Sequence, residues 1–408
     1  MVPHPTRARA KDPALRSYPF PYTAWLVLSN DPDNTLYADW QELDRVIWNE
    51  IGLPFADSLF FRSYNKNLPD QVDLFGHPEI LNKHPHDTIH TWGDYLFGGS
   101  RGFERDDAVR LVDQAKTLHF KPRVWVDHST FAGNLLHHHP YGSMPEINDA
   151  SGHKYPNPLY SLDLIQEIGV RYIWDGTIIP TLGQDRPLPW LTYHLERTGS
   201  RKQAVVNLAK HKVGEVMGVG AGFRAQFKDN AAYRPHRFPD GRMFYTFQRH
   251  GQWQKADIDG LGDILAPSRI DRLIATGGVC IAYTHLGKRP AGRMGDRQHI
   301  PNRTRQGLQH LRERHIERKV MLSPLSHLLD YLVLRDNITV DLKNKGILFH
   351  ADGIAFSSVD QKTLAGHTFS IRSQGITPEQ WVVKGTEGRL TPRIEQNDSR
   401  CATLHFDL

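Results

Sequence analysis

The feature that most constrains this chain is a set of six short apolar runs, each ending in a residue that can bind a metal or carry a proton. The runs are AWLVLSND, DTIHTWGD, RVWVDH, RYIWD, MFYTFQRH and VCIAYTH. Short runs rich in Val, Ile, Trp and Tyr are typical of strands buried on both faces, as in a parallel sheet. Polar groups collect at the carboxyl ends of such strands, where a parallel barrel opens onto one cavity. The pattern therefore predicts an enzyme.

Segments with helical spacing of apolar residues alternate with these runs. A further strand is expected at 57–65, which brings the strands to about seven. Alternation of strands and helices over most of a chain favours a parallel barrel or a doubly wound sheet. The expected helices span 39–51, 105–118, 161–168, 268–276, 303–318 and 325–334.

The sequence pattern changes after residue 334. Short alternating segments separated by Gly, Asp and Asn turns follow, with no helical pattern between them, which predicts a small antiparallel β domain. We therefore expect three parts: an irregular N-terminal arm at 1–22, an α/β catalytic domain at 23–334 and a β-rich domain at 335–408.

Composition excludes several classes of partner. The 50 Lys and Arg residues are nearly balanced by 45 Asp and Glu, and no window interleaves basic with aromatic residues, so no nucleic-acid partner is expected. No run approaches the roughly 20 apolar residues of a membrane span, and the N-terminus has no apolar signal region. The two cysteines, Cys280 and Cys401, cannot form a disulfide framework. These features predict a cytoplasmic protein and leave its oligomeric state open.

The most specific local signal is the segment HTWGD at 90–94. If the chain turns into a helix just past the strand, His90 and Asp94 can face one cation, because they lie four residues apart. Asp31 would complete a three-ligand site with water in the open position. A metal in such a site lowers the pKa of bound water and polarises a carbonyl oxygen, which suits hydrolysis. His285, at the end of the last run, would protonate the leaving group.

Three motifs resemble the polysaccharide deacetylase superfamily, the NodB-homology carbohydrate esterases. Leu28-Ser29-Asn30-Asp31 resembles the first motif, HTWGD the second, and IAYTH at 281–285 the late motif whose histidine is the general acid. The resemblance implies a distorted (β/α)7 barrel of the glycoside hydrolase and deacetylase type. It also implies a divalent metal, most of all Zn²⁺, and removal of an acyl group, acetyl in particular, from a sugar or related amide.

The chain departs from this family at two positions. Asn30 stands where the family has its catalytic base, so Asp33, Asp127 or Asp175 would take that role. Asp94 replaces a histidine ligand, which suits zinc but also other divalent ions. Substrate contacts are expected from two tryptophans that could stack on a sugar ring and from three polar residues near strand ends: Trp92, Trp174, His128, Asn134 and Arg249.

Two other functions fit the same residues. A glycoside hydrolase on a related barrel would use Asp127 and Asp175 as its two carboxylates. A catalytically inactive, carbohydrate-binding homologue would be explained by Asn30 in place of the base.

Overall fold

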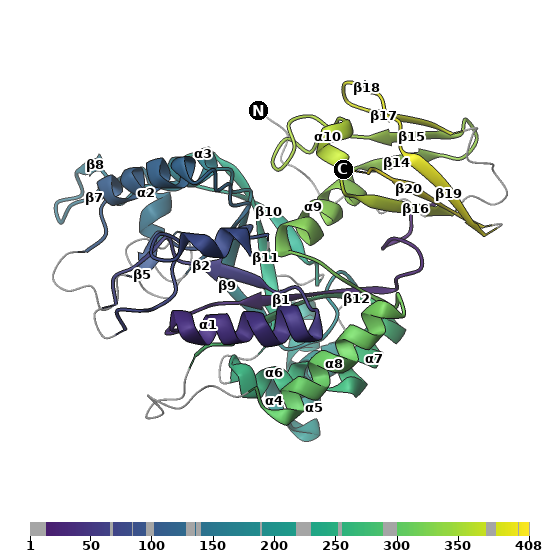
Figure 1. Cartoon of the computed structure of the whole chain (residues 1–408), viewed down its shortest axis with the longest axis horizontal. Helices are drawn as coiled ribbons and strands as arrows, with labels where there is room; N and C mark the ends of the chain where they lie inside the picture. Colours follow the sequence, from purple (N-terminus) through teal and green to yellow (C-terminus); the bar gives the residue numbers. More distant parts are fainter. Residues whose placement is uncertain are drawn as a thin grey trace.

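The computed structural model of the chain describes residues 14–65, 68–83, 85–94, 102–127, 135, 140–187, 190–217, 230–251, 255–288, 300–372, 381–398 and 400–407. Figure 1 shows a larger part, in which helices surround strands, and a smaller part of strands near the C-terminus. None of the helices in these ranges combines the length and apolar character that a bilayer crossing requires.

Seven parallel strands close into a barrel. Neighbours around the ring follow chain order, and β12 pairs with β1 along the whole length of β1 to close it. The predicted parallel barrel is confirmed, because a doubly wound sheet would have two open edges. All six apolar runs form barrel strands. The strands are β1 (Ala24–Asn30), β2 (Ala56–Leu59), β4 (Thr88–His90), β6 (Val124–Val126), β9 (Tyr172–Ile179), β11 (Met243–His250) and β12 (Gly278–Thr284).

Further strands extend or flank the barrel. β13 (Val320–Leu322) pairs with the first three residues of β1, whereas β2 pairs with its last two, so the neighbour of β1 changes along its length. β10 (Tyr233–Arg237) runs antiparallel to β11. Two small ribbons pair β3 (Arg62–Ser63) with β5 (Gly93–Asp94) and β7 (Glu146–Asn148) with β8 (Lys154–Pro156).

All six predicted helices form. They correspond to α1 (Tyr37–Leu43) with a π-helical continuation at Asp44–Ile51, α2 (Arg105–Thr117), α3 (Leu162–Glu167), α7 (Pro267–Thr276), α8 (Asn302–Ile316) and α9 (Leu325–Asp336). Short 3₁₀ turns lie at Pro78–Asn82 and Pro140–Ser143.

Three barrel helices were not predicted: α4 (Trp190–Thr198), α5 (Arg201–Met217) and α6 (Ile258–Ile264). In α5 the side chains of Val205, Val206 and Val213 are exposed, so the helix lacks the single apolar stripe by which a buried helix is recognised.

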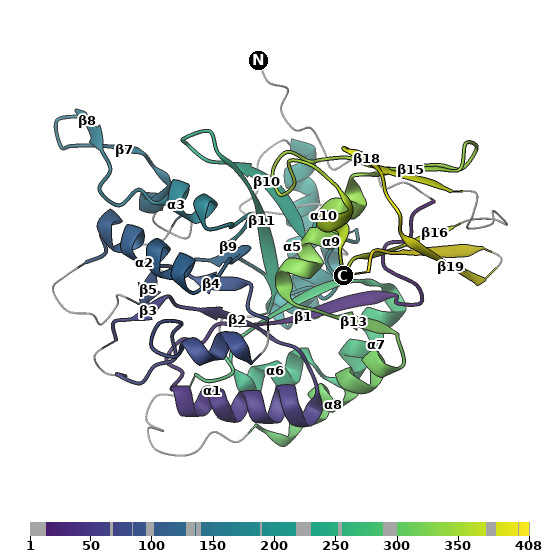
Figure 2. The ribbon, with the colours of Figure 1, turned by 45° about the horizontal axis from the view of Figure 1, so that its top comes forward.

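The C-terminal part contains two small sheets joined to the barrel by α9. One sheet has the order β14 (Ile338–Asp341), β15 (Gly346–Phe349), β17 (Val382–Gly385) and β18 (Gly388–Arg389), and the other β16 (Thr368–Arg372), β20 (Cys401–His405) and β19 (Arg393–Asp398). The predicted antiparallel β domain is confirmed apart from β15 and β17, which pair in parallel. A short helix, α10 (Gln361–Leu364), lies between β15 and β16. Figure 2 shows α9 passing between the barrel and these strands.

Side chains of each barrel strand alternate between two environments. Trp25 and Val27 of β1 point inward and belong to a buried cluster that includes Val126 and Ile281. Leu26 and Leu28 point outward and pack with residues of the surrounding helices. This alternation is a property of extended backbone. It continues to the strand ends, where it decides which polar side chains face the barrel interior.

Candidate active site

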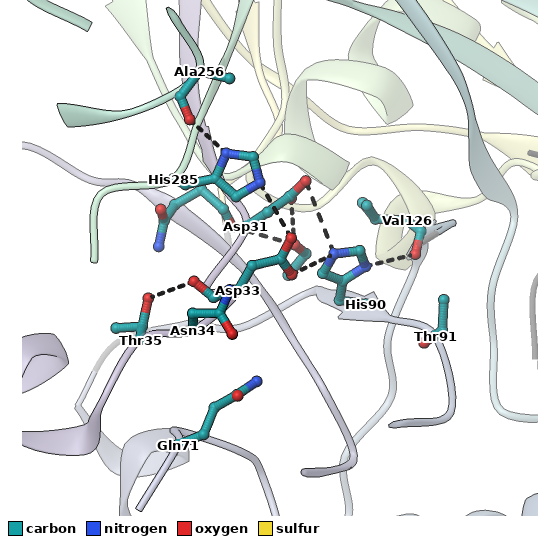
Figure 3. A network of polar contacts seen from close by, with 12 residues as sticks. Asp31, Asp33, Asn34, Thr35, Gln71, His90, Thr91, Val126, Ala256 and His285 are labelled. Atoms are coloured by element: carbon teal, nitrogen blue, oxygen red, sulfur yellow. Dashed lines mark hydrogen bonds and ion pairs between the residues drawn. The ribbon is translucent and has the colours of Figure 1, made fainter. Parts of the chain in front are cut away.

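A carboxylate lying between two imidazoles forms the centre of the site (Figure 3). Oδ1 of Asp33 is 3.2 Å from Nε2 of His90, and Oδ2 is 3.3 Å from Nε2 of His285. His90 is the last residue of β4 and His285 directly follows β12. Both imidazoles are nearly inaccessible, with 1% and 7% of their side-chain surfaces exposed. The carboxyl end of the barrel therefore holds a carboxylate in contact with two imidazoles.

Backbone carbonyls set the orientation of both imidazoles. Nδ1 of His90 lies 3.0 Å from the carbonyl oxygen of Val126, and Nδ1 of His285 contacts that of Ala256. A carbonyl oxygen only accepts, so each Nδ1 carries a hydrogen and each Nε2 faces Asp33. A neutral imidazole would point a lone pair at the carboxylate. A contact between Nε2 and a carboxylate oxygen is favourable only when a proton or a cation lies between the two atoms.

A buried ion pair lies next to this centre. The guanidinium of Arg249 donates two parallel hydrogen bonds to Asp31, at 2.7 and 2.8 Å, and the Ser58 hydroxyl donates a third at 2.6 Å. Burial alone would raise the pKa of Asp31, but Arg249 and the nearby His90 outweigh it and hold this pKa below its usual value. Asp31 therefore carries a negative charge, with its Oδ2 4.0 Å from Nε2 of His90.

Two aromatic rings enclose Arg249. Its guanidinium carbon lies 3.5 Å from the ring centre of Trp174 and 4.4 Å from that of Tyr283, and none of the Arg249 surface is exposed. Stacking between rings is a favourable environment for a planar guanidinium. Arg249 is therefore placed to hold Asp31, and the predicted contact between Arg249 and substrate has no exposed surface to use.

Asn30 joins three strands on the outer side of the barrel wall. Its amide nitrogen donates to Oδ1 of Asp57 at 2.5 Å, and its oxygen accepts from the backbone nitrogen of Leu286 at 2.7 Å. Trp40 donates to the other oxygen of Asp57. Burial raises the pKa of Asp57 to about 7, although the donors on Asn30 and Trp40 act in the opposite direction. The position that the family resemblance assigns to a base thus holds a structural amide.

The two other predicted carboxylates occupy different surroundings. Asp127 is 1% exposed and accepts hydrogen bonds from the indole of Trp125 and the backbone nitrogen of Leu135. Asp175 lies where the pairing of β9 with β11 shifts register, and it accepts from the backbone nitrogen of Thr177. Burial raises the pKa of Asp175.

The helical turn predicted after His90 does not form. Thr91 adopts a positive φ of 56°, and Gly93–Asp94 continue as the extended strand β5 beside β3. His90 and Asp94 therefore do not lie on one helical face. The side chain of Asp94 lies outside the part of the chain that is described, and so do His128 and Asn134.

The contacts of Asp31 and His90 in the structure differ from those predicted for metal ligands. Both oxygens of Asp31 are bound by Arg249, so a cation on that carboxylate would also face a guanidinium. Asp33, His90 and His285 are the types of ligand that zinc takes, but the two imidazoles approach different oxygens of the carboxylate. Within the described ranges, no three His, Cys, Asp or Glu side chains are arranged to hold one ion. As placed, these residues pair with one another, and the metal stays a prediction.

The two tryptophans predicted to stack on a sugar are buried. Trp92 has no exposed surface and packs against Phe61 and Trp125, while its indole nitrogen donates to Ser161. Trp174 is 2% exposed, and Arg249 lies over its ring. A ring in the core has no free face for a sugar.

The alternation of side chains along each strand distinguishes the strand-end residues that point into the barrel from those that point outward. On β1, β11 and β12 the residues 31, 249 and 285 have the same parity as the inward apolar residues, whereas 30 and 250 have the opposite parity. The contact between Asp33 and both histidines was not predicted, because Asp33 lies past the strand end. Only closure of the barrel brings β4 and β12 to either side of it.

Comparisons with known proteins assign no family. No protein-family model matches the sequence, and no curated protein matches it. Among solved structures, the chain is similar to a 4-alpha-glucanotransferase from Thermococcus litoralis, with 11% identity and a TM-score of 0.37. The similarity covers 76% of this chain and 40% of that one, so this chain spans less than half the length of the glucanotransferase. The fold assignment therefore rests on the strand pairing alone.

Proposed function

We propose that the chain is a hydrolase that removes an acyl group, acetyl in particular, from a sugar or a related amide. The observation that carries the proposal is the placement of Asp33 between Nε2 of His90 and Nε2 of His285. Hydrolysis needs one group that takes a proton from water and another that gives a proton to the leaving group. Two imidazoles in contact with one carboxylate supply both. The choice of an acylated sugar follows from the HTWGD and IAYTH motifs.

The proposed reaction moves two protons. Water attacks the acyl carbon while it loses a proton to the pair formed by Asp33 and His90. The bond between the acyl carbon and the leaving nitrogen or oxygen then breaks, and Nε2 of His285 donates a proton to that leaving atom. The carbonyls of Val126 and Ala256 keep both rings in the required orientation throughout.

The ion pair of Asp31 and Arg249 is assigned a positioning role. Its carboxylate lies 4.0 Å from Nε2 of His90 and is held in place by Arg249. A buried carboxylate without this partner would take up a proton instead. The pair therefore keeps a negative charge beside the histidine that accepts the proton.

The predicted Zn²⁺ belongs to a second form of this proposal. Asp33, His90 and His285 would have to rearrange to bind it, because as placed the two imidazoles approach different oxygens of Asp33, and Asp31 is engaged by Arg249. Metal analysis of the purified protein separates the two forms. One divalent ion per chain that is lost in both His90→Ala and His285→Ala would replace the proton-based centre with a metal-based one.

A glycoside hydrolase is the second candidate function, and one observation favours it. Burial raises the pKa of Asp175, which lies inside β9 at the register shift with β11, and a raised pKa is the property required of a glycosidase acid. Asp127 would be the partner carboxylate. It accepts hydrogen bonds from the indole of Trp125 and the backbone nitrogen of Leu135.

Release of acetate from N- and O-acetylated sugars tests the main proposal, with aryl glycosides assayed in parallel. We expect acetate release by the wild-type protein and a loss of at least about a hundredfold in Asp33→Asn and His285→Ala. His310→Ala is the matched control, because His310 pairs with Asp271 on the outer helices, away from the barrel strands.

Other outcomes would contradict this function. Glycoside cleavage that depends on Asp175 and is insensitive to Asp33→Asn would favour the second candidate. Sugar binding with no turnover of either substrate class would instead indicate an inactive carbohydrate-binding protein.

A further inference from the structure

A second site lies on the outer side of the barrel wall, near the carboxyl ends of β9 and β11. It is a pocket of about 330 Å³. Three cationic side chains, Lys255, Arg269 and Arg303, line it together with one carboxylate, Asp263. Asp263 pairs with Lys255 at 2.9 Å and also contacts Arg303. Cations outnumber carboxylates in the lining, so the pocket has an excess of positive charge.

Arg269 is the cation best placed to act on a ligand. Its guanidinium donates to Nε2 of His250 at 3.2 Å, and Nδ1 of His250 donates to the carbonyl of Thr181. Burial, together with the charge of Arg269, lowers the pKa of His250 to about 3, so this ring is a neutral acceptor. The guanidinium is therefore held in place by a group that does not neutralise its charge.

Carboxylates satisfy little of the charge on Arg269. Glu196 is 4.0 Å from it, and that carboxylate is bound more closely by Arg272, at 2.7 Å. The Nε atom of Arg269 is buried and has no hydrogen-bond partner among the described residues. A guanidinium that lines a pocket and has an unused N–H donor can bind a tetrahedral oxyanion.

We infer that this pocket binds a phosphate group, either as the free ion or carried by a sugar. A guanidinium and an ammonium from different elements can contact several phosphate oxygens at once. The lining also includes Ser268 in the first turn of α7, where backbone amides favour an anion. The volume is within the range of sites for small ligands, which leaves room for a group attached to the phosphate.

The pocket is separate from the Asp33 centre but shares two elements with it. His250 follows Arg249 on β11, and Lys255 precedes Ala256, whose carbonyl orients His285. None of the lining residues belongs to the histidine–carboxylate cluster. The inference therefore goes beyond the proposed hydrolysis, and phosphate binding can be measured whether or not the protein turns over an acylated sugar.

Isothermal titration tests it, with inorganic phosphate, glucose 6-phosphate and glucose as probes at constant ionic strength. We expect the wild-type protein to bind one or both phosphates, and Arg269→Gln to bind them on the order of tenfold more weakly, as follows from loss of a charge-assisted hydrogen bond. Lys255→Gln should weaken binding in the same direction. Arg305→Gln is the matched control, because it removes the same charge from α8 at a position outside the pocket.

The comparison of probes identifies the source of the phosphate. Tighter binding of glucose 6-phosphate than of inorganic phosphate would assign the site to a sugar phosphate, and equal binding would assign it to the free ion. Absence of phosphate binding to the folded wild-type protein, or equal weakening by Arg269→Gln and Arg305→Gln, would overturn the inference.

Discussion

Arg249 and Asp31 form a fully buried ion pair on the inner face of the barrel. Arg249→Met would leave Asp31 buried without its partner, since both carboxylate oxygens accept from that guanidinium. Breaking such a pair from one side costs about 3–5 kcal/mol. We expect a loss of this size in the free energy of unfolding, measured by urea denaturation at pH 7.

Two variants control for this loss. Arg45→Ala removes an exposed arginine that pairs with Glu42 and should lower the free energy of unfolding far less than Arg249→Met. The double variant Asp31→Asn with Arg249→Met should recover part of the stability. A loss below about 1 kcal/mol in Arg249→Met alone would show that the pair is not a stabilising feature.

Asp57 gives the protein a pH-dependent stability. Its pKa is about 7 in the folded chain and about 4 when unfolded. Between these values the folded state holds a proton that the unfolded state has released, so stability falls as the pH rises from about 4 to about 7. The contribution of Asp57 to this fall is on the order of 4 kcal/mol or less.

Asp57→Asn removes this titration, so its unfolding free energy should change less across the window than that of the wild-type protein. The variant also loses the carboxylate oxygen that accepts the hydrogen bond from the Trp40 indole, and this loss lowers stability at all pH values. Asp106→Asn, an exposed change on α2, should follow the wild-type curve. Parallel curves for the wild type and Asp57→Asn would contradict the assignment.

At the scale of elements, the junction of β1, β2 and β12 depends on one amide. Asn30 donates to Asp57 of β2 and accepts from Leu286 after β12. Asn30→Asp would place a second carboxylate against Asp57, where the two would have to share a proton. We expect a loss of about 1–3 kcal/mol at pH 8 and a smaller loss at pH 5, measured by chemical denaturation.

This variant also tests whether position 30 can supply a base. Because residue 30 points away from the Asp33 centre, Asn30→Asp should not raise hydrolytic activity. Asn49→Asp is a suitable control, since Asn49 also donates to a carboxylate, Asp44, but at an exposed position. A gain of activity in Asn30→Asp would show that the outward orientation is incorrect.

At the scale of the whole molecule, one hydrophobic cluster joins the barrel to the C-terminal sheets. It contains Trp25 inside the barrel, Tyr331 of α9 and Phe369 of β16. The rings of Trp25 and Tyr331 are 4.9 Å apart, and those of Tyr331 and Phe369 are 5.2 Å apart. Parts that share a buried core lose it together, so we expect a single transition in differential scanning calorimetry.

Phe369→Ala should move this transition as a whole and lower stability by about 3–5 kcal/mol. Val382→Ala, at a half-exposed position in the other small sheet, should have a much smaller effect. Two resolved transitions in the wild-type protein, or a shift confined to part of the melting curve in Phe369→Ala, would show that the C-terminal part unfolds independently.

The strands and most helices of the barrel could be predicted from the sequence because their apolar spacing is local. The six runs needed burial on both faces, and that requirement is visible in each run alone. Helix α5 could not be recognised, since its exposed valines obscure the apolar stripe. The turn after His90 was also beyond the sequence pattern, because a threonine with positive φ redirects the chain from helix to strand.

The candidate site, too, could be predicted only in part from the sequence. That ionisable residues gather at the carboxyl ends of buried strands followed from the chain alone, because a packed barrel interior excludes them. Which of them meet was decided by closure of the barrel, which brings His90 of β4 and the end of β12 to opposite sides of Asp33. Pairing of Asp31 with Arg249 likewise required β1 and β11 to face each other across the interior. Such contacts join residues more than 50 positions apart, and no local pattern encodes them.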